Sequence, residues 1–471
     1  MARGLGKNPF IIPLFLLMAG VLGITTFAMS RLETNLGVLI GLGIVVSILV
    51  FFKTTFAIYL LIFSMLLSPE FALSGLATSG ASLGRGVTFR FDDFLLVIIA
   101  ISWFVKGALY KELGIFKRTP LNGAMLFYIF TCLLSTVIGI GAGRVELLTG
   151  GLFVLKYLQY FLLFFLVINN IKDEQQLRRY WIAVVMTALI VAVIGVAQIP
   201  GGGRVSAPFE GTSAEPNTFG GYLAFLTLIC IALSLTSQKF GTRMAYLVVS
   251  FSLFVPFMFT LSRASYLGFV PGLAVVLFLN RNHYLSYGIM VVVLGVFIFP
   301  QVFPEIIRDR ITFTWSQTAR SGQRIILGQR VDTSTSARLE SFDHVLRDFP
   351  EEPLFGYGIT GWGFIDAQYF RTLIETGLLG LAAFLFLVYR LLRLGLDRLR
   401  YFREDPFYRG LSIGFLGGLT ALLIHGIGSN TFIIVRIMQP FWLVAGLLFM
   451  SRLLVQVESP EEKAEPVAEA V

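Results

Sequence analysis

Long apolar runs follow one another along almost the whole chain, separated by short polar segments. Within each run the apolar residues are continuous, whereas strands of membrane barrels alternate apolar and polar residues. Runs of ~18–20 residues match the length of a helix that crosses a bilayer. The pattern predicts an all-α polytopic helical membrane protein with about 12–14 transmembrane helices. The runs, of which 55–68 is short for a span, fall near 10–28, 35–52, 55–68, 92–109, 122–141, 150–169, 181–199, 218–236, 244–261, 265–280, 284–303, 368–389, 409–427 and 435–454.

One long interruption breaks this pattern, between about residues 304 and 365. Loops of this length without structure of their own are uncommon unless they are functional. After the Ser/Thr run 333–336, a one-sided apolar stripe predicts a short helix, and four glycines over 356–363 predict a flexible turn. The expected organisation is therefore N-terminal spans over 1–200, further spans over 201–303, the loop over 304–365, C-terminal spans over 366–457 and a disordered tail over 458–471. The stripe consists of Leu339, Phe342, Val345, Leu346 and Phe349.

Composition agrees with a membrane protein. Of 471 residues, 56% are hydrophobic and 14% are charged, against about 25% charged in a soluble domain. The net charge is +9, but the basic residues recur in short clusters between apolar runs and form no nucleic-acid face. Both cysteines, Cys132 and Cys230, lie within apolar runs, and the three histidines are scattered. We therefore expect no disulfide framework, no metal site and no cofactor.

The clusters of Lys and Arg predict the orientation in the lipid bilayer. If the N-terminus is cytoplasmic, nearly all of these clusters fall on the cytoplasmic side, as the positive-inside rule requires. Both termini are then cytoplasmic, and the loop 304–365 faces outward. The residues placed inside are Lys53, Lys106, Lys111, Lys117, Arg118, Lys172, Arg178, Arg179, Lys239, Arg243, Arg281, Arg390, Arg393, Arg398, Arg400, Arg403 and Arg409.

Charged residues within or beside the spans are candidates for function because lipid makes them costly. Lys156 lies inside one run, and Arg263 lies at the outward end of another, where snorkelling to the headgroups is the simpler interpretation. Arg371 and Glu375 lie four residues apart on one helix face, so a mutually satisfied structural pair is equally compatible. Asp366 lies just before them, at the same outward mouth.

The long loop is rich in arginine. Between Arg308 and Arg338 it carries six Arg against two Asp, Asp309 and Asp332. Arginines at a membrane face suit an anionic ligand such as a diphosphate, and a nearby carboxylate could accept a proton from a hydroxyl nucleophile. A solvated face or a lipid-headgroup contact explains the same stretch without any ligand.

Four motifs over roughly residues 200–390 resemble the O-antigen ligase and polymerase superfamily. "RVSAPFEGTSAEPNTFGGYLAF" resembles a stretch common in members tied to exopolysaccharide, and "TLSRASYLGFVPGLAVVLFL" looks like the signature span pair. "SARLESFDHVLRDFPEEPLFGYGITGWGF" is similar to the outward loop, and "DAQYFRTLIETGLLGLAAFLFL" to the span that follows it. The motifs occur in the order and topological frame of the family.

The resemblance implies a metal-independent, inverting glycosyltransferase at the outer face of the bacterial cytoplasmic (inner) membrane. Its donor would be a glycan on a polyprenyl diphosphate, and its acceptor a sugar hydroxyl. Where the ligases have a histidine, this chain reads "IDAQYF", with Asp366 or Gln368 instead, which favours the polymerase branch. That branch implies a chain-length regulator and a repeat-unit flippase as partners. The expected catalytic residues are Arg263, Arg338, Asp366 and Glu375, and the expected substrate-binding residues are Arg204, Asn217, Lys156, Tyr369 and Arg371.

Two other functions remain open. A ligase would transfer a finished glycan to a lipid or protein acceptor. A transporter or flippase of lipid-linked oligosaccharide would show internal repeats and polar residues at mid-membrane, whereas the unusual charges here lie toward one face. A structural scaffold would leave the six-arginine stretch and Lys156 without a role.

Overall fold

The computed structural model describes residues 54–68, 70–72, 88–109, 117–209, 215–280 and 329–458, with short pieces between 288 and 326. The runs predicted near 10–28 and 35–52 lie outside the described residues. So do almost all of the run near 284–303 and the tail from residue 459. The predicted division of the chain at residues 200, 303, 365 and 457 stays a prediction.

The described chain is helical, with the predicted spans at the predicted places. The helices are α3 (Thr54–Leu67), α4 (Phe91–Leu109), α5 (Asn122–Gly141), α6 (Leu147–Asn170), α7 (Glu174–Gln198), α8 (Pro216–Thr236), α9 (Phe240–Phe259), α10 (Arg263–Leu279), α13 (Thr333–Asp348), α14 (Gln368–Tyr401), α15 (Pro406–His425) and α16 (Val435–Glu458). Two short 3₁₀ turns are η1 (Ile199–Gly201) and η4 (Phe349–Glu351). Eight of the described helices are long and apolar enough to cross a membrane, and α3 and α10 are shorter apolar helices. The prediction of an all-α polytopic membrane protein is confirmed.

Helix α8 is the centre of the bundle and packs against α9, α10 and α15. Almost all of its side chains are buried, whereas α9 exposes Val248 and Phe251 at the periphery. Small residues let α10 and α15 approach closely, as is usual between membrane helices. A Cβ on Gly268 would lie 2.3 Å from the Ala421 carbonyl oxygen, so this contact requires glycine. Close helix packing thus brings the ends of α8, α10 and α15 together.

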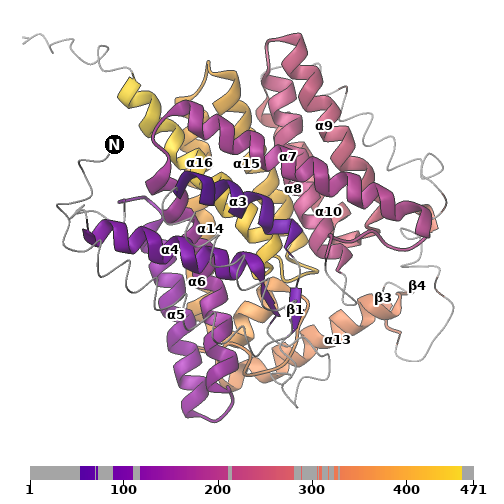
Figure 1. Ribbon diagram of the computed structural model, residues 1–471. Helices are drawn as coiled ribbons and strands as arrows, with labels where there is room; N and C mark the ends of the chain where they lie inside the picture. The colour runs from indigo at the N-terminus through magenta and orange to yellow at the C-terminus, as the bar shows by residue number, and fades with distance from the viewer. Residues whose placement is uncertain are drawn as a thin grey trace, which may run out of the picture.

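The face of the molecule that carries residues 323–367 is called the loop face below. Figure 1 shows α13 lying across this face, below α10. Asp332 caps α13 by accepting hydrogen bonds from the backbone N–H groups of the first turn. Val345 of the predicted apolar stripe is fully buried and packs with Ile365 and Ile374 in a small second core. The ring of Phe342 stacks on Phe370, with centroids 4.1 Å apart. The predicted amphipathic helix is therefore packed on the start of α14.

Helix α14 is broken at Gly377, which has φ 66° and ψ −170°. A Cβ there would lie 2.3 Å from the carbonyl oxygen of Leu354, so only glycine fits. The break leaves backbone groups unpaired, and residues 353–358 pair with them. Tyr357 N–H donates to the Ile374 carbonyl at 2.9 Å, and Leu378 N–H donates to the Pro353 carbonyl at 2.8 Å. The glycine turn predicted as flexible is hydrogen-bonded along the break instead.

Two short hairpins accompany the helices. Strands β1 (Glu70–Ala72) and β2 (Thr88–Arg90) are antiparallel, and β3 (Ile325–Ile326) pairs with β4 (Gln329–Arg330) just before α13. The sequence pattern did not predict them, because strands of two or three residues leave no periodicity. The second hairpin leads the chain into the cap of α13.

Candidate functional site at the loop face

The ends of α8, α9 and α10 are joined by hydrogen bonds at the loop face. Ser262, the N-cap of α10, donates its hydroxyl to Asn217 Oδ1 at 2.8 Å. Arg204 Nη2 reaches the same oxygen at 3.3 Å, and Arg204 Nε donates to a backbone carbonyl at the end of α9. Three predicted site residues, Arg204, Asn217 and Arg263, therefore lie on one continuous surface.

Arg263, the first residue of α10, is held by Asp332 at the start of α13. Its Nη1 lies 2.7 Å from Asp332 Oδ2 and its Nη2 lies 3.0 Å from Oδ1, a bidentate pair. Asp332 is 1% exposed. Burial opposes its ionisation, but hydrogen bonds from Arg263, Ser334 and Thr335 outweigh burial and hold the pKa of Asp332 well below its ordinary value. This pair fixes α13 over the tip of α10.

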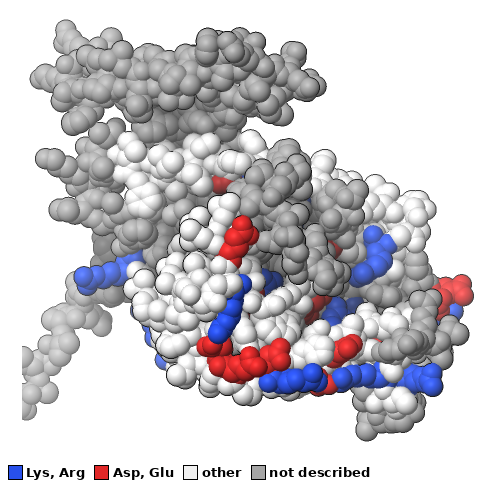
Figure 2. Space-filling model, turned by 90° about the horizontal axis from the view of Figure 1, so that it is seen from below, with Lys and Arg blue, Asp and Glu red and all other residues white. Residues whose placement is uncertain are grey.

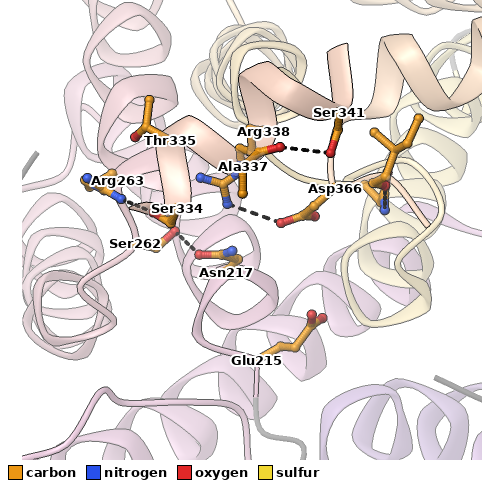
Figure 3. Close-up of polar contacts among 12 residues, drawn as sticks. Glu215, Asn217, Ser262, Arg263, Ser334, Thr335, Ala337, Arg338, Ser341 and Asp366 are labelled. Carbon is orange, nitrogen blue, oxygen red and sulfur yellow. Dashed lines mark hydrogen bonds and ion pairs between the residues drawn. The ribbon is translucent and has the colours of Figure 1, made fainter. Parts of the chain in front are cut away.

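Arg338 and Asp366 form a looser pair beside it. Arg338 Nη2 lies 3.2 Å from Asp366 Oδ2, and the two side chains are 30% and 32% exposed. Figure 3 shows the Arg338 guanidinium between Asn217 and Asp366, with the carboxylate of Glu215 turned toward the same space. The Nε atom of Arg338 is buried and makes no hydrogen bond within the described part of the chain. Arg338 is thus a cation that solvent reaches and that a single carboxylate contacts.

The remaining arginines of the loop form no uniform basic patch where they are described. Figure 2 views the molecule from below and shows acidic and basic side chains side by side. Arg324, for example, pairs with Asp343. Arg310 and Arg320 lie outside the described residues. The solvated-face interpretation therefore fits Arg324, whereas Arg338 belongs to the site.

Gln368 and Tyr369, at the start of α14, make hydrogen bonds to the end of α15 and to the residues that follow it. Gln368 is fully buried, and its backbone N–H donates to the Gly426 carbonyl at 2.9 Å. Its side-chain Oε1 accepts the Phe432 N–H at 2.9 Å. Tyr369 donates its hydroxyl to the Leu423 carbonyl at 2.7 Å. Of the two residues that could stand in for the family histidine, only Asp366 is on the open side.

The residues that connect α15 to α16 pass beneath the site, and we call residues 425–432 the floor. Asn430 Nδ2 donates to the carbonyl of Ile365, next to Asp366, at 2.6 Å. His425 is 1% exposed and its Nδ1 lies 2.6 Å from Thr431 Oγ1. The floor also contacts α10 and α8, since a Cβ on Gly428 would lie 3.5 Å from Ala264 Cβ and one on Gly221 would lie 3.2 Å from the His425 ring.

Arg371 and Glu375 are paired away from the open side. Their Nε and Oε1 atoms lie 3.1 Å apart, and the side chains are 8% and 2% exposed. Glu375 Oε1 also accepts the Thr360 N–H at 3.1 Å, while the Arg371 guanidinium lies over the Phe153 ring of α6. The pair thus links the turn of residues 353–361 to α14. The structure does not bring Glu375 together with Arg338.

Lys156 belongs to a separate polar cluster. It pairs with Asp93 of α4, whose other oxygen accepts from Gln159 at 2.6 Å. Beside them, Arg90 lies 2.5 Å from Asp92. Among the described residues these side chains come from β2, α4 and α6, and none comes from α8, α10 or α13. Lys156 is therefore not among the side chains gathered around Arg338.

Several residues of this surface were not singled out from the sequence. Ser262 stands in the quoted "TLSRASYLG" motif, so its position beside Arg263 was a signal that could have been used. In the sequence Asp332 is one acid among the loop arginines, and His425 is one of three scattered histidines. Asn430 left no signal, because its role depends on a contact with a residue 65 positions away.

No group of three His, Cys, Asp or Glu side chains that could hold a metal ion occurs among the described residues. The charged groups at the loop face are Arg204, Arg263, Arg338, Asp366 and Glu215, while Asp332 is buried against Arg263. Three arginines so placed suit a phosphate-bearing ligand, and the partly exposed carboxylate of Asp366 can exchange a proton.

Comparison with known proteins bears on this site. No curated protein matches the chain. The family match begins at residue 248 and ends at residue 385, a narrower range than the predicted 200–390. It contains both pairs, Arg263–Asp332 and Arg338–Asp366, whereas the floor lies beyond it. Residues 248–385 of this multi-pass membrane protein match the family described as O-antigen ligase, which confirms the predicted resemblance to the O-antigen ligase and polymerase superfamily over that part of the chain.

Proposed function

We propose that this protein transfers an oligosaccharide from a polyprenyl diphosphate to a sugar hydroxyl, and that it polymerises repeat units in this way. The observation that carries the proposal is the partly exposed Arg338–Asp366 pair beside Arg263 and Asn217. A cation and a carboxylate within one open surface supply the two groups that the reaction needs. The matched family supports a glycosyltransferase of the ligase or polymerase type.

Arg338 binds the diphosphate in this proposal. Its single contact with Asp366 leaves it able to pair with a phosphate, and its fork geometry suits phosphate oxygens. Arg263 lies on the same surface, 21% exposed, and adds positive charge while it remains held by Asp332. Arg204 contributes from the side of Asn217. Together they stabilise the negative charge that develops on the departing diphosphate.

Asp366 takes the proton. The acceptor hydroxyl oxygen attacks the anomeric carbon, the bond from that carbon to the diphosphate oxygen breaks, and the hydroxyl proton passes to the Asp366 carboxylate. One glycosidic bond forms, with inversion, and polyprenyl diphosphate leaves. Glu375 is the weaker candidate for the base, because it is buried and paired with Arg371.

The loop face is outward in this proposal. The opposite end of α14 carries the run of cations that the positive-inside rule places in the cytoplasm, Arg390, Arg393, Arg398 and Arg400. The site then meets the outer surface of the bacterial inner membrane, both termini are cytoplasmic, and a flippase that delivers repeat units and a chain-length regulator are the partners. A ligase is the second candidate, since the matched family is described by that activity.

Deletion of the gene followed by gel analysis of the surface glycan tests the proposal. Single repeats still attached to their acceptor, without the ladder of longer chains, are the result expected of a polymerase. Lipid-linked polymer that accumulates without transfer marks a ligase instead. An unchanged ladder would overturn both. Purified protein in lipid nanodiscs, supplied with lipid-linked repeats, should then form polymer without other proteins.

A further inference from the structure

Three buried polar atoms without hydrogen bonds belong to side chains around one place. Ten buried side-chain atoms make no hydrogen bond in the described part of the chain, and three of them are Arg338 Nε, His425 Nε2 and Asn430 Oδ1. Native proteins leave few such atoms, and each one calls for an explanation. An unsatisfied buried polar group costs about 1–3 kcal/mol, so three that lie around one site indicate a common cause.

The floor fixes both neutral groups in orientation. Asn430 donates its Nδ2 to the Ile365 carbonyl at 2.6 Å, which leaves Oδ1 as an acceptor on the other side of the amide. His425 Nδ1 is taken by Thr431 Oγ1 at 2.6 Å, so Nε2 is the ring atom left over. His425 also lies against the first turns of α8, since a Cβ on Gly221 would lie 3.2 Å from its ring. Both residues are nine-tenths buried, at 1% and 6% exposed.

The chemistry of these atoms suits a hydroxyl group. A hydroxyl donates one hydrogen bond and accepts two, so it can satisfy an amide oxygen or an imidazole nitrogen in either tautomer. Neither Asn430 nor His425 offers the guanidinium that a phosphate prefers. The floor is therefore matched to an uncharged, polyhydroxylated part of a ligand, and Asn430 places it next to Asp366 through its contact with Ile365.

We propose that His425 and Asn430 form a sugar subsite. They hydrogen-bond hydroxyls of the sugar attached to the diphosphate that Arg338 binds, and they set which sugar is accepted at that position. This inference rests on the proposed function, because it takes the ligand to be a lipid-linked glycan. It adds a region outside the matched residues 248–385, namely the connection between α15 and α16.

Two lipid probes separate sugar binding from diphosphate binding. Purified protein in nanodiscs is titrated at 4 °C with polyprenyl diphosphate that carries no sugar, and with the lipid-linked repeat isolated from a strain lacking this protein. The variants are Asn430→Leu and His425→Gln. The matched control is Thr227→Val, because Thr227 Oγ1 is likewise buried without a hydrogen bond but lies in the middle of α8.

The expected result is a selective loss. Each floor variant binds the lipid-linked repeat about tenfold more weakly, the effect of about 1.4 kcal/mol, and binds the sugar-free lipid as the wild type does. The Thr227→Val variant binds both lipids normally. Equal loss for both lipids, or no loss for either, would overturn the subsite. Wild-type protein that binds neither lipid would instead overturn the proposed function itself.

Discussion

Two arginine–carboxylate pairs lie between residues 338 and 375, and they differ in burial and in the number of further partners. Arg371–Glu375 is 8% and 2% exposed and has a further backbone partner at Thr360. Arg338–Asp366 is 30% and 32% exposed and makes a single contact of 3.2 Å. The N–O distances are almost equal, so distance does not separate them. Burial and the number of further partners show which charges hold the fold and which remain able to meet a ligand.

The largest expected effect is on catalysis at Asp366. We expect Asp366→Asn to lower polymer formation by about 10²–10⁴-fold, because an amide does not accept the hydroxyl proton. Thermal stability should change little, since the side chain is one-third exposed. Polymer formation by reconstituted protein, measured alongside thermal unfolding, checks both halves. Wild-type activity in Asp366→Asn would exclude Asp366 as the base.

Glu375→Gln should have the opposite effect from Asp366→Asn, a loss of stability without a loss of catalysis. It leaves the Arg371 charge buried without its carboxylate, and breaking a buried pair costs about 3–5 kcal/mol. The expected outcome is a large drop in unfolding temperature, while protein that remains folded keeps its activity per molecule. The double variant Arg371→Met/Glu375→Leu should recover much of the stability, because it removes both charges. Loss of activity without loss of stability would reverse the roles given to the two pairs.

Arg338→Ala removes the cation proposed to bind the diphosphate. Activity should fall about 10²–10³-fold, as for other groups that stabilise developing negative charge. Arg338→Lys should recover part of the activity, because lysine restores the positive charge but not the planar guanidinium. Full activity of Arg338→Ala in membranes would show that the diphosphate binds elsewhere.

Asp332→Asn tests the Arg263 pair with a smaller change. Asparagine still caps a helix, so the variant removes only the charge, and we expect a loss of about 2 kcal/mol, as for hydrogen bonds to charged groups. Asp173→Asn is the matched control, since Asp173 caps α7 by accepting the Gln176 N–H. Because the pKa of Asp332 is lowered in the folded protein, its stabilisation is present above its ordinary pKa and is lost only in strong acid. The difference in unfolding free energy between wild type and Asp332→Asn should therefore be constant from about pH 5 upward, as followed by thermal unfolding. A difference that became smaller within that range would contradict the pairing.

Much of the fold followed from local pattern. The apolar run 122–141 coincides with α5 (Asn122–Gly141), and the stripe after residues 333–336 became α13. Such features depend on residues three or four apart, so a single sequence contains them. The sequence also placed Arg263, Arg338 and Asp366 at one mouth. It could not distinguish Asp366 from Glu375, because that distinction depends on neighbours packed from other helices.

The features of the site that the sequence did not predict depend on contacts between residues far apart in the chain. Arg263 and Asp332 are 69 residues apart, and Asn430 meets Ile365 across 65 residues. Their hydrogen bonds depend on how α10, α13 and the floor are packed, which no local periodicity records. Lys156 is the converse case: a charge within a span predicted a substrate-binding residue, and the structure places it beside Asp93 of α4, away from Arg338.

The break at Gly377 has a consequence for how the protein meets membranes of different thickness. Helix α14 has 34 residues, about 50 Å of helix, against a hydrocarbon layer of about 30 Å. A helix that exceeds the layer tilts to fit it, and a straight α14 would swing Asp366 with every change of tilt. The turn of residues 353–358 is hydrogen-bonded to Ile374 before the break and to Leu378 just after it, so a change of tilt is taken up at this bend and Asp366 keeps its position. Activity in nanodiscs should stay level as the lipid chains are lengthened, while the tilt of residues 378–401 changes.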